Sequence, residues 1–215
     1  MSAKTSGKPG RRAAAQAQPS TRSALLTAAR RLFARDGYQA VSVRQLAQEA
    51  NVNPAMVKYH FRNKEGLYLA VIQETVSPIL QQFAALVADG PLDREALAGL
   101  LRSYMALLQR EAWLPPLVTR EVLLRDGPLR TAFTNQIARR VVSGLKGAVA
   151  DAPATRRSGA DLTALSVLAM VLFPFIGRPV VKSALGITLD EQYAEQMAEH
   201  IAALIFAQAG KEEST

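Results

Sequence analysis

The sequence predicts an all-α protein, and three of its features support this fold class. Alanine and leucine are abundant whereas aromatic residues make up only 6% of the 215 residues, a composition that favours helices. Apolar residues recur at helical spacing along most of the chain, and Gly, Pro and Asn separate these segments. The apolar–polar alternation of a half-buried strand is missing from the sequence. We therefore expect helices throughout, in an N-terminal three-helix domain and a C-terminal helical domain.

The N-terminal segments carry clear start and stop signals. Residues 1–20 are Ala, Gly, Pro, Ser and basic residues with almost nothing to bury, so we expect a disordered basic tail. A first helix begins directly after this tail and ends at Gly37. A second helix follows Ser42, which forms the pattern of a capping box with Gln45.

A third short helix opens at Asn53 and Pro54, because proline is favoured in the first turn of a helix. Asn63 caps a fourth helix, which is expected to run to about Pro78. Turn signals such as AspGlyPro and ProPro divide the rest of the chain. The longer helices expected there cover 78–88, 93–111, 115–125, 128–150, 160–176 and 190–208.

The segment 162–177, LTALSVLAMVLFPFIG, contains no charged residue. It is shorter than the roughly 20 residues that a membrane-spanning helix needs, and Arg178 follows at once. A helix that is apolar all round is usually buried in a core or at a subunit interface. Together with the last helix it could form a two-helix face, and two such faces would make a four-helix dimer interface. The residues of the last helix expected in this face are Gln192, Tyr193, Met197, Ile201, Leu204 and Ile205.

The positive charge is concentrated at one end of the chain. Residues 1–65 hold 12 Lys and Arg against 3 Asp and Glu, whereas residues 66–215 hold 14 against 15. The net charge of +8 therefore comes entirely from the first third. A basic domain joined to a near-neutral one indicates a polyanion-binding head and a body with another role.

The sequence offers little for catalysis or metal binding. It has no cysteine, which excludes disulfides and thiolate ligands and suits a cytoplasmic location, and the N-terminus lacks the apolar stretch of a secretory signal. Its two histidines, His60 and His200, do not have the spacing of a zinc-binding helix. Nucleophile-elbow, phosphate-loop and dinucleotide motifs are also missing. We therefore expect no enzyme activity, metal, cofactor or membrane association.

The stretch VRQLAQEANVNPAMVKYHF has the spacing of a helix-turn-helix. Ala47 provides the small residue where two helices cross, and Asn51 tolerates the positive φ of the turn. Val57 provides the aliphatic plug of the second helix, while Leu46 and Val52 complete the apolar contacts. Other helical hairpins can show this spacing by chance.

The flanking residues are more specific. The segments AARRLFARDGY, VSVRQLAQEA, YHF and NKEGLYLAV occur in order between residues 21 and 75. This region resembles the DNA-binding domain of the TetR/AcrR family of bacterial transcriptional regulators. Two departures are Asn51 in place of the usual turn glycine and Lys58 where the family often has tyrosine. The resemblance implies a homodimer, usually a repressor, that binds a near-palindromic DNA operator and responds to a small-molecule effector.

The resemblance and the chemistry of the side chains together suggest the DNA contacts. The expected residues are Ser42, Arg44, Asn53, Pro54, Ala55, Lys58, Tyr59, His60 and Lys64. Asn53 and Lys58 lie near the start of the recognition helix and can read base edges, Lys58 alternatively a phosphate. Tyr59 and His60 either contact the DNA backbone or serve packing. Lys64 and the N-terminus of its helix are expected to share one phosphate.

An effector pocket is expected between the helices predicted at 93–111, 115–125 and 160–176. The candidate lining residues are large and apolar: Tyr104, Met105, Leu108, Trp113, Leu117, Met170 and Phe173. Such residues more often simply fill a core, so packing is the alternative role. Arg120 and Glu121 either form a structural ion pair or meet a polar ligand.

The expected organisation is a DNA-binding domain over 21–67 and an effector-binding and dimerisation domain over 68–215. The helix at 64–76 bridges the two and is the candidate transmitter of the effector signal. A different class of function stays open, namely a helical interaction module whose basic head binds nucleic acid or acidic partners without operator specificity.

Overall fold

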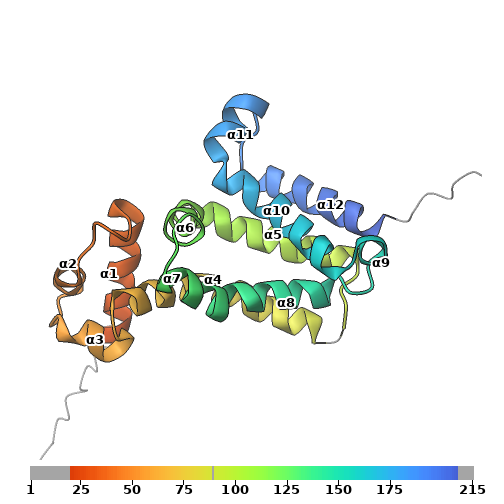
Figure 1. The fold of residues 1–215 in the computed structure, drawn as a ribbon. Helices are drawn as coiled ribbons and strands as arrows, with labels where there is room; N and C mark the ends of the chain where they lie inside the picture. The colour runs from red at the N-terminus through yellow and green to blue at the C-terminus, as the bar shows by residue number, and fades with distance from the viewer. Residues whose placement is uncertain (1–19, 89, 208–215) are drawn as a thin grey trace, which may run out of the picture.

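The computed structural model describes residues 20–88 and 90–207, and in this part of the chain every regular element is a helix (Figure 1). The expected tail, residues 1–19, lies outside the described residues. The first elements are α1 (Thr21–Asp36), α2 (Val43–Glu49), α3 (Ala55–Phe61), α4 (Lys64–Val87) and α5 (Arg94–Arg110). They are followed by α6 (Leu114–Val118), the π-helix η1 (Thr119–Leu123), α7 (Pro128–Phe133), the π-helix η2 (Thr134–Ala138) and α8 (Arg139–Ala148). The last elements are α9 (Pro153–Ser158), α10 (Ala160–Ile176), α11 (Arg178–Leu185) and α12 (Glu191–Phe206). The all-α prediction is confirmed.

Helices α1 to α3 and the first turns of α4 form a small unit at one end of the molecule, which we call the head (Figure 1). Its core is aromatic at the centre, where the ring of Phe33 lies 5.7 Å from that of Tyr38 and 5.6 Å from that of Tyr68. Aliphatic side chains surround these rings. The buried aliphatic residues of this core include Leu25, Leu32, Val41, Leu46, Val57 and Leu67.

The predicted caps and turn of the head are present. The Ser42 hydroxyl accepts a hydrogen bond from the Gln45 amide, and the Gln45 side chain accepts one from the Ser42 amide, so the capping box is complete. Asn51 has φ +52°, as the turn between α2 and α3 requires. The Val52 amide then donates to the Ala47 carbonyl at 2.9 Å. These local contacts set the angle at which α3 leaves α2.

Helix α4 is longer than predicted. The expected break at Pro78 is wrong, because α4 continues through this residue to Val87 and replaces the separate helix predicted at 78–88. Proline removes one helical hydrogen bond and costs about 3 kcal/mol in a helix interior. Val76 and Phe83 are buried on either side of Pro78, and their packing stabilises the helix where this hydrogen bond is missing. The predicted domain boundary after residue 67 therefore falls inside one continuous helix.

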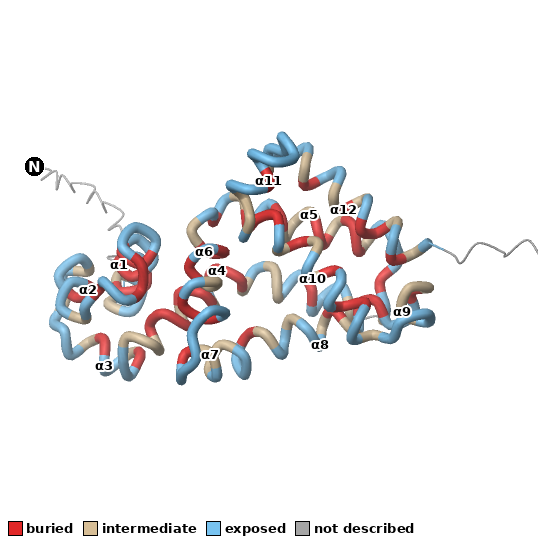
Figure 2. The backbone as a smooth tube through the Cα atoms, turned by 45° about the horizontal axis from the view of Figure 1, so that its top comes forward, coloured by how far each residue is buried: buried red, intermediate tan, exposed pale blue. Residues whose placement is uncertain are grey.

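The remaining helices form a second unit, the body, around the distal part of α4 (Figure 1). Helix α12 packs along α5, while α8 and α10 pack against each other and α8 also lies on α4. Red, buried segments of α4, α5 and α10 face one another across the interior in Figure 2. The prediction of single helices over 115–125 and 128–150 is incomplete, because a π-helical turn interrupts each of them, at η1 and η2. An extra residue in a turn leaves no strong sequence signal.

Two short helices were not predicted. Helix α9 begins with Pro153, and α11 ends at Gly186, whose φ of +69° closes it in the left-handed conformation. Among the described residues, no single helix has the length and hydropathy of a membrane span. Helices α10 and α11 reach that length and hydropathy only when taken together, and they are bent by 84° relative to each other.

Candidate nucleic-acid interface and ligand cavity

Helix α3 has one buried face and one exposed face. Val57 and Phe61 point into the head and are buried, which fixes the rotation of the helix. The opposite face therefore points to solvent. Its exposed residues are Asn53, Pro54, Ala55, Lys58 and Tyr59. Five of the nine predicted DNA-contacting residues thus share one surface at the start of α3.

The side chains on this surface have hydrogen-bonding groups to spare. The Asn53 side-chain oxygen accepts from the Ala55 amide at 2.8 Å, which orients the side chain and leaves its NH2 group free. Tyr59 is 78% exposed, an unusual position for an aromatic ring of this size. His60 is half-buried beneath it, with ring centroids 4.9 Å apart in an edge-to-face arrangement. This contact is compatible with the packing role considered for His60, and its DNA-backbone contact stays a prediction.

The cations of the head divide into two groups. The arginines of α1 are paired with carboxylates: Arg22 with Glu74, Arg30 with Glu111, Arg31 with Glu49 and Arg35 with Asp36. Arg44, Lys58 and Arg62 are exposed and have no carboxylate partner among the described residues. Arg44 lies on α2, Lys58 on α3 and Arg62 directly after α3, so the unpaired positive charge of the head is on the α2–α3 side.

Ser42 and Lys64 are placed differently from the expectation. The Ser42 hydroxyl is already bonded to Gln45 in the capping box. The Lys64 ammonium points inward and donates to the carbonyl oxygens of Tyr38 and Val41 at 3.0 and 2.9 Å. It also lies 4.2 Å from the centre of the Tyr38 ring. Partial burial lowers the pKa of Lys64 below its ordinary value. The structure therefore shows this ammonium joining α4 to the segment before α2 through two of its three donors. The phosphate contact predicted for Lys64 stays a prediction.

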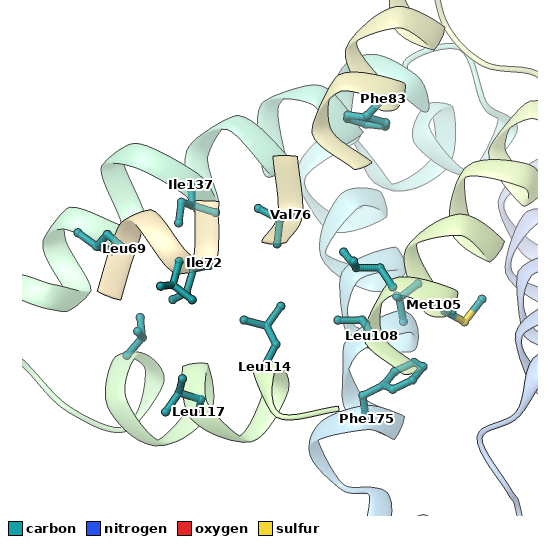
Figure 3. Close-up of a cluster of buried hydrophobic side chains, with 14 of the residues drawn as sticks. Leu69, Ile72, Val76, Phe83, Met105, Leu108, Leu114, Leu117, Ile137 and Phe175 are labelled. Carbon is teal, nitrogen blue, oxygen red and sulfur yellow. The ribbon is translucent and has the colours of Figure 1, made fainter. Parts of the chain in front are cut away.

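The body contains an apolar cavity of about 300 Å³. Figure 3 shows buried side chains of α4, η2, α5 and α6, among them Ile72, Val76, Ile137, Leu108 and Leu114, converging from different sides. The residues that line the cavity are Ile72, Val76, Ile79, Leu80, Phe83, Leu100, Leu101, Tyr104, Leu108, Leu114, Pro115, Val118, Thr119, Leu123, Phe133, Ile137, Ala138, Val141, Val142, Leu145, Val167, Leu168, Val171, Leu172 and Ile176.

The predicted pocket residues divide between the cavity wall and other places. Tyr104 and Leu108 line the cavity. Met105 and Leu117 are buried core residues off the wall, and Met170 is half-buried against the core. The remaining two predicted residues, Trp113 and Phe173, also do not line the cavity.

Trp113 and Phe173 both lie off the cavity wall. The Trp113 indole donates to Glu111 at 2.8 Å, and the Arg30 guanidinium lies 5.8 Å from its ring centre. Trp113 therefore belongs to the junction with the head. Phe173 is 62% exposed. A helix presents different faces to different neighbours, so residue size alone does not identify the face that lines a cavity.

About half of the cavity wall comes from segments that were not proposed for it. Helix α4 contributes Ile72, Val76 and Phe83, and the run from η2 into α8 contributes Ile137 and Leu145. Both sets follow helical spacing and could have been found as apolar stripes. What the stripes do not reveal is that they face each other across an unfilled space.

The segment η1 connects the cavity with the head. Thr119 and Leu123 line the cavity, whereas the Glu121 side chain turns away from it and is only 1% exposed. Glu121 pairs with Arg120 at 2.7 Å and accepts from the Gln39 amide of the head at 3.4 Å.

The Arg120 guanidinium completes this contact. It lies so close to Gly37 that a Cβ atom there would be 2.0 Å from one of its nitrogens. Nearby, the Tyr68 hydroxyl donates to the Leu117 carbonyl at 3.4 Å. Arg120 and Glu121 thus form a structural ion pair at the boundary of head and body, outside the cavity.

Helix α10 leaves an apolar stripe uncovered. Leu162, Leu165 and Phe173 are each more than half exposed along one side of it, and Leu204 of α12 is exposed as well. Ile201 and Ile205, which were expected in the same face, are buried inside the body instead. Soluble monomers rarely expose large contiguous apolar areas. No group of three or more His, Cys, Asp or Glu with the geometry of a metal site occurs within residues 20–88 and 90–207.

Comparison with known sequences identifies the family of the head. Residues 25–71 match the family model described as bacterial regulatory proteins, tetR family. The HTH-type transcriptional repressor Rv1474c of Mycobacterium tuberculosis is 31% identical over 104 residues, 48% of this chain and 51% of that protein. The HTH-type transcriptional repressor AcnR of Corynebacterium diphtheriae is 30% identical over 107 residues, 50% and 52% of the two chains. The chain spans about half the length of the curated relatives it matches.

Solved structures extend the likeness to the body at the level of the fold. The transcriptional regulator FadR from Bacillus subtilis, solved in complex with stearoyl-CoA, superposes with a TM-score of 0.65 at 17% identity, over 86% of this chain and 98% of that one. The fatty acid degradation regulator FadR from Bacillus halodurans gives 0.67 at 16% identity, over 86% and 96%. These identities support a common fold and nothing finer. Residues 25–71 thus match the TetR family of bacterial regulatory proteins, and the chain as described shares the fold of the two solved regulators.

Proposed function

We propose that this protein is a transcriptional repressor that binds a palindromic DNA operator as a homodimer and releases it when a small molecule occupies the cavity of the body. The observation that carries the proposal is the exposed face of α3, which combines polar groups able to read bases with unpaired cations. Two of the relatives named above are transcriptional repressors, which supports the sign of regulation. A regulator of this kind acts on the chromosome and therefore in the cytoplasm.

On DNA, α3 enters the major groove by its N-terminal residues. The free NH2 group of Asn53 reads a base edge, Lys58 reads a guanine or binds a phosphate, and Pro54 and Ala55 meet thymine methyl groups. Arg44, Arg62 and the Tyr59 hydroxyl bind phosphates on either side. In contrast to these, Ser42 and Lys64 act indirectly, by holding the start of α2 and the segment before it in place.

Dimerisation uses the uncovered stripe on α10 together with the exposed residues of α12. Packing Leu165 and Phe173 against a second copy would remove both from water and complete a four-helix interface. The two copies of α3 would then face successive major-groove segments, about 34–36 Å apart in the simplest operator geometry. A palindromic operator follows from the two-fold symmetry of such a dimer.

The effector acts because the cavity and the head share structural elements. Helix α4 lines the cavity with Ile72 and Val76 and begins in the head, which supports a role for it as one transmitter of the effector signal. Segment η1 is a second one, since it lines the cavity on one side and holds Gly37 and Gln39 of the head on the other. A ligand weakens DNA binding only as far as it prefers the head orientation that does not fit the operator.

Variants of single side chains test the assignment of roles on an operator selected from genomic DNA. We expect Asn53→Ala and Lys58→Ala to change base preference at one or two positions, by about 1–3 kcal/mol each. Arg44→Ala should weaken binding to all sequences and lower the slope of log K against log salt by about one. Lys182→Ala, which removes an exposed lysine of α11, is the matched control and should change neither. Losses that are uniform across DNA sequences in Asn53→Ala, Lys58→Ala and Arg44→Ala, with the control unchanged, would favour the alternative, a basic head without operator specificity.

A solved relative bears on the ligand. The Bacillus subtilis regulator of similar fold was crystallised with stearoyl-CoA, which supports a small molecule with a substantial hydrocarbon part as an effector for this fold.

A further inference from the structure

The wall of the cavity is almost entirely hydrocarbon. Among its lining side chains, the hydroxyl groups of Tyr104 and Thr119 are the sole polar groups, and no charged side chain of the described residues belongs to the wall. Charged residues adjacent in sequence to the wall are not part of it: Arg120 and Glu121 pair with each other at the head, and Arg130 donates to the Val122 carbonyl. Arg139 and Arg140, between the lining residues Ala138 and Val141, are exposed and do not line the cavity. The cavity therefore offers neither a counter-ion nor a dense set of hydrogen-bond donors.

Such a wall discriminates strongly by charge. Moving an ionised carboxylate or ammonium group into an apolar site without a partner is so unfavourable that the group becomes neutral instead. An uncharged ligand pays no such cost and gains from the burial of its own apolar surface. The chemistry of the wall thus excludes ionised head groups more firmly than it selects a particular carbon skeleton.

The two hydroxyl groups define where a polar group of the ligand can sit. Tyr104 is half-buried in the wall of the cavity, and its hydroxyl forms no hydrogen bond with another described residue. Burial raises the pKa of Tyr104 to about 12, so this hydroxyl stays protonated and able to donate at neutral pH. It can donate to a carbonyl or hydroxyl oxygen of a ligand, and it can accept a hydrogen bond as well.

The volume sets the size of the occupant. At about 300 Å³ the cavity is about twice the ~150 Å³ engineered cavity that holds one benzene molecule. It lies at the lower end of ligand pockets in general, which begin at about 300 Å³. A chain of about ten carbon atoms or a bicyclic aromatic molecule is on this scale.

We infer that the cavity binds an uncharged, hydrocarbon-rich small molecule of medium size, with a single hydroxyl or carbonyl group placed against Tyr104. The occupant is a neutral alcohol, ester, ketone or phenol-like compound, as opposed to an ionised fatty acid or an amine. Binding itself follows from the cavity alone, whereas its regulatory meaning rests on the proposed function.

A matched series of ligands tests this inference on the full-length protein. N-phenyl-1-naphthylamine serves as a fluorescent probe of the cavity, and 1-decanol, decanoic acid and decylamine compete for it at pH 7.3. A carboxyl group with a pKa of about 4.3 is neutral in only about one molecule in a thousand at this pH. We expect decanol to displace the probe, and decanoic acid and decylamine to bind about 100-fold to 1,000-fold more weakly.

The pH dependence separates exclusion of charge from exclusion of shape. Between pH 7.3 and pH 5.3, the affinity of decanoic acid should rise about tenfold per unit, because only its neutral form enters. The affinity of decanol should stay constant over the same range. Equal and pH-independent affinities for decanol and decanoic acid would overturn the inference, since the head group would then lie in solvent or meet a charged partner.

Two variants and a control place the ligand in this cavity. Ala138→Phe fills space at the wall and should abolish displacement, provided that its circular dichroism and thermal unfolding match the parent protein. Tyr104→Phe should weaken decanol binding about threefold to tenfold and leave the affinity for decane, which cannot hydrogen-bond, unchanged. Tyr193→Phe is the matched control, because the buried Tyr193 hydroxyl also lacks a partner among the described residues but lies outside this cavity.

The two proposals fail in different ways. Probe binding that Ala138→Phe does not affect, or decanol binding that Tyr104→Phe and Tyr193→Phe change equally, would contradict the inference about the cavity. Operator binding measured on the same samples reports separately on the proposed function. A protein that binds decanol as predicted and shows no DNA preference would keep the first and lose the second.

Discussion

The head and the body of this protein encode function in opposite ways. In the head, each functional feature depends on contacts a few residues apart: the Ser42 cap, the positive φ of Asn51, and the buried Val57 that turns the exposed face of α3 outward. In the body, the cavity exists because α4, α5, α8 and α10 pack around a space that their side chains do not fill. A surface such as the exposed face of α3 can therefore be identified from the local sequence. A cavity depends instead on how helices far apart in the sequence pack together.

The largest expected effect concerns the head core. Phe33 is 1% exposed and touches the rings of Tyr38 and Tyr68, so we expect Phe33→Ala to lower the free energy of unfolding by about 3–5 kcal/mol. Urea denaturation measures this loss. If the body stays folded when the head is destabilised, N-phenyl-1-naphthylamine should still bind the cavity of this variant. Loss of probe binding at temperatures where the body is folded would show that the two regions form one cooperative unit.

The uncovered stripe of α10 tests the body at its surface. Phe173→Glu places a charge in the proposed dimer interface and should shift the dimerisation equilibrium by about 2–4 kcal/mol toward monomers. Analytical ultracentrifugation over a concentration series measures the shift. Leu124→Glu is the control, because Leu124 is also exposed but lies beyond η1, away from α10. Equal dissociation in the two variants, or in neither, would contradict the assignment of the interface.

Lys64 decides between a structural and a DNA-contacting role. Lys64→Met keeps the aliphatic stem but removes the ammonium that bonds the carbonyls of Tyr38 and Val41. We expect a loss of about 1.5–3 kcal/mol in the stability of the head, since hydrogen bonds to charged groups contribute about this much. The salt slope of DNA binding should stay within experimental error of the parent value. A slope lowered by about one, with unchanged stability, would restore the phosphate contact expected from the sequence.

Glu121 tests the link between the two regions. Glu121→Gln keeps the shape of the side chain and removes its charge pair with Arg120 and Arg125. We expect the loss of operator affinity caused by decanol to shrink by about 1–2 kcal/mol, a typical coupling free energy. The affinities for decanol alone and for DNA alone should change less. Glu195→Gln, which breaks the exposed pair with Arg102 inside the body, should leave the coupling intact.

The smallest expected effect is a pH dependence at the junction. Burial alone would raise the pKa of Glu111, but hydrogen bonds from Arg30 and Trp113 and the charges of Arg30 and Arg110 hold it below its usual value of 4.5. A carboxyl whose pKa is lowered on folding stabilises the protein above the unfolded pKa. That contribution disappears as the pH falls through the folded value. The parent should therefore unfold at a higher temperature than Glu111→Gln at pH 7, and this difference should shrink as the pH falls below 4.5.

The sequence predicted the head more completely than the body, for physical reasons. Caps and the turn at Asn51 are set by interactions within four residues, so the all-α fold and the two short helices followed from them. The inward direction of Lys64 did not, because it depends on the carbonyls of Tyr38 and Val41, which only the folded head brings to its side chain.

The body was harder to predict because propensity competes with tertiary packing there. Pro78 signalled a helix end, and the burial of Val76 and Phe83 overrode that signal. Phe173 was placed in a pocket by its size, yet its position on α10 turns it outward. Tyr104 and Leu108 were placed correctly because they lie on the side of α5 that faces the cavity.

The central claim is that the exposed face of α3 reads DNA sequence. The most direct measurement is selection of genomic DNA fragments by the purified full-length protein at moderate salt, followed by sequencing of the bound fraction. The account predicts enrichment of fragments that share an inverted repeat, with enrichment lost or redirected in Asn53→Ala. Recovery of fragments in proportion to their abundance, identical for the parent protein and this variant, would contradict it.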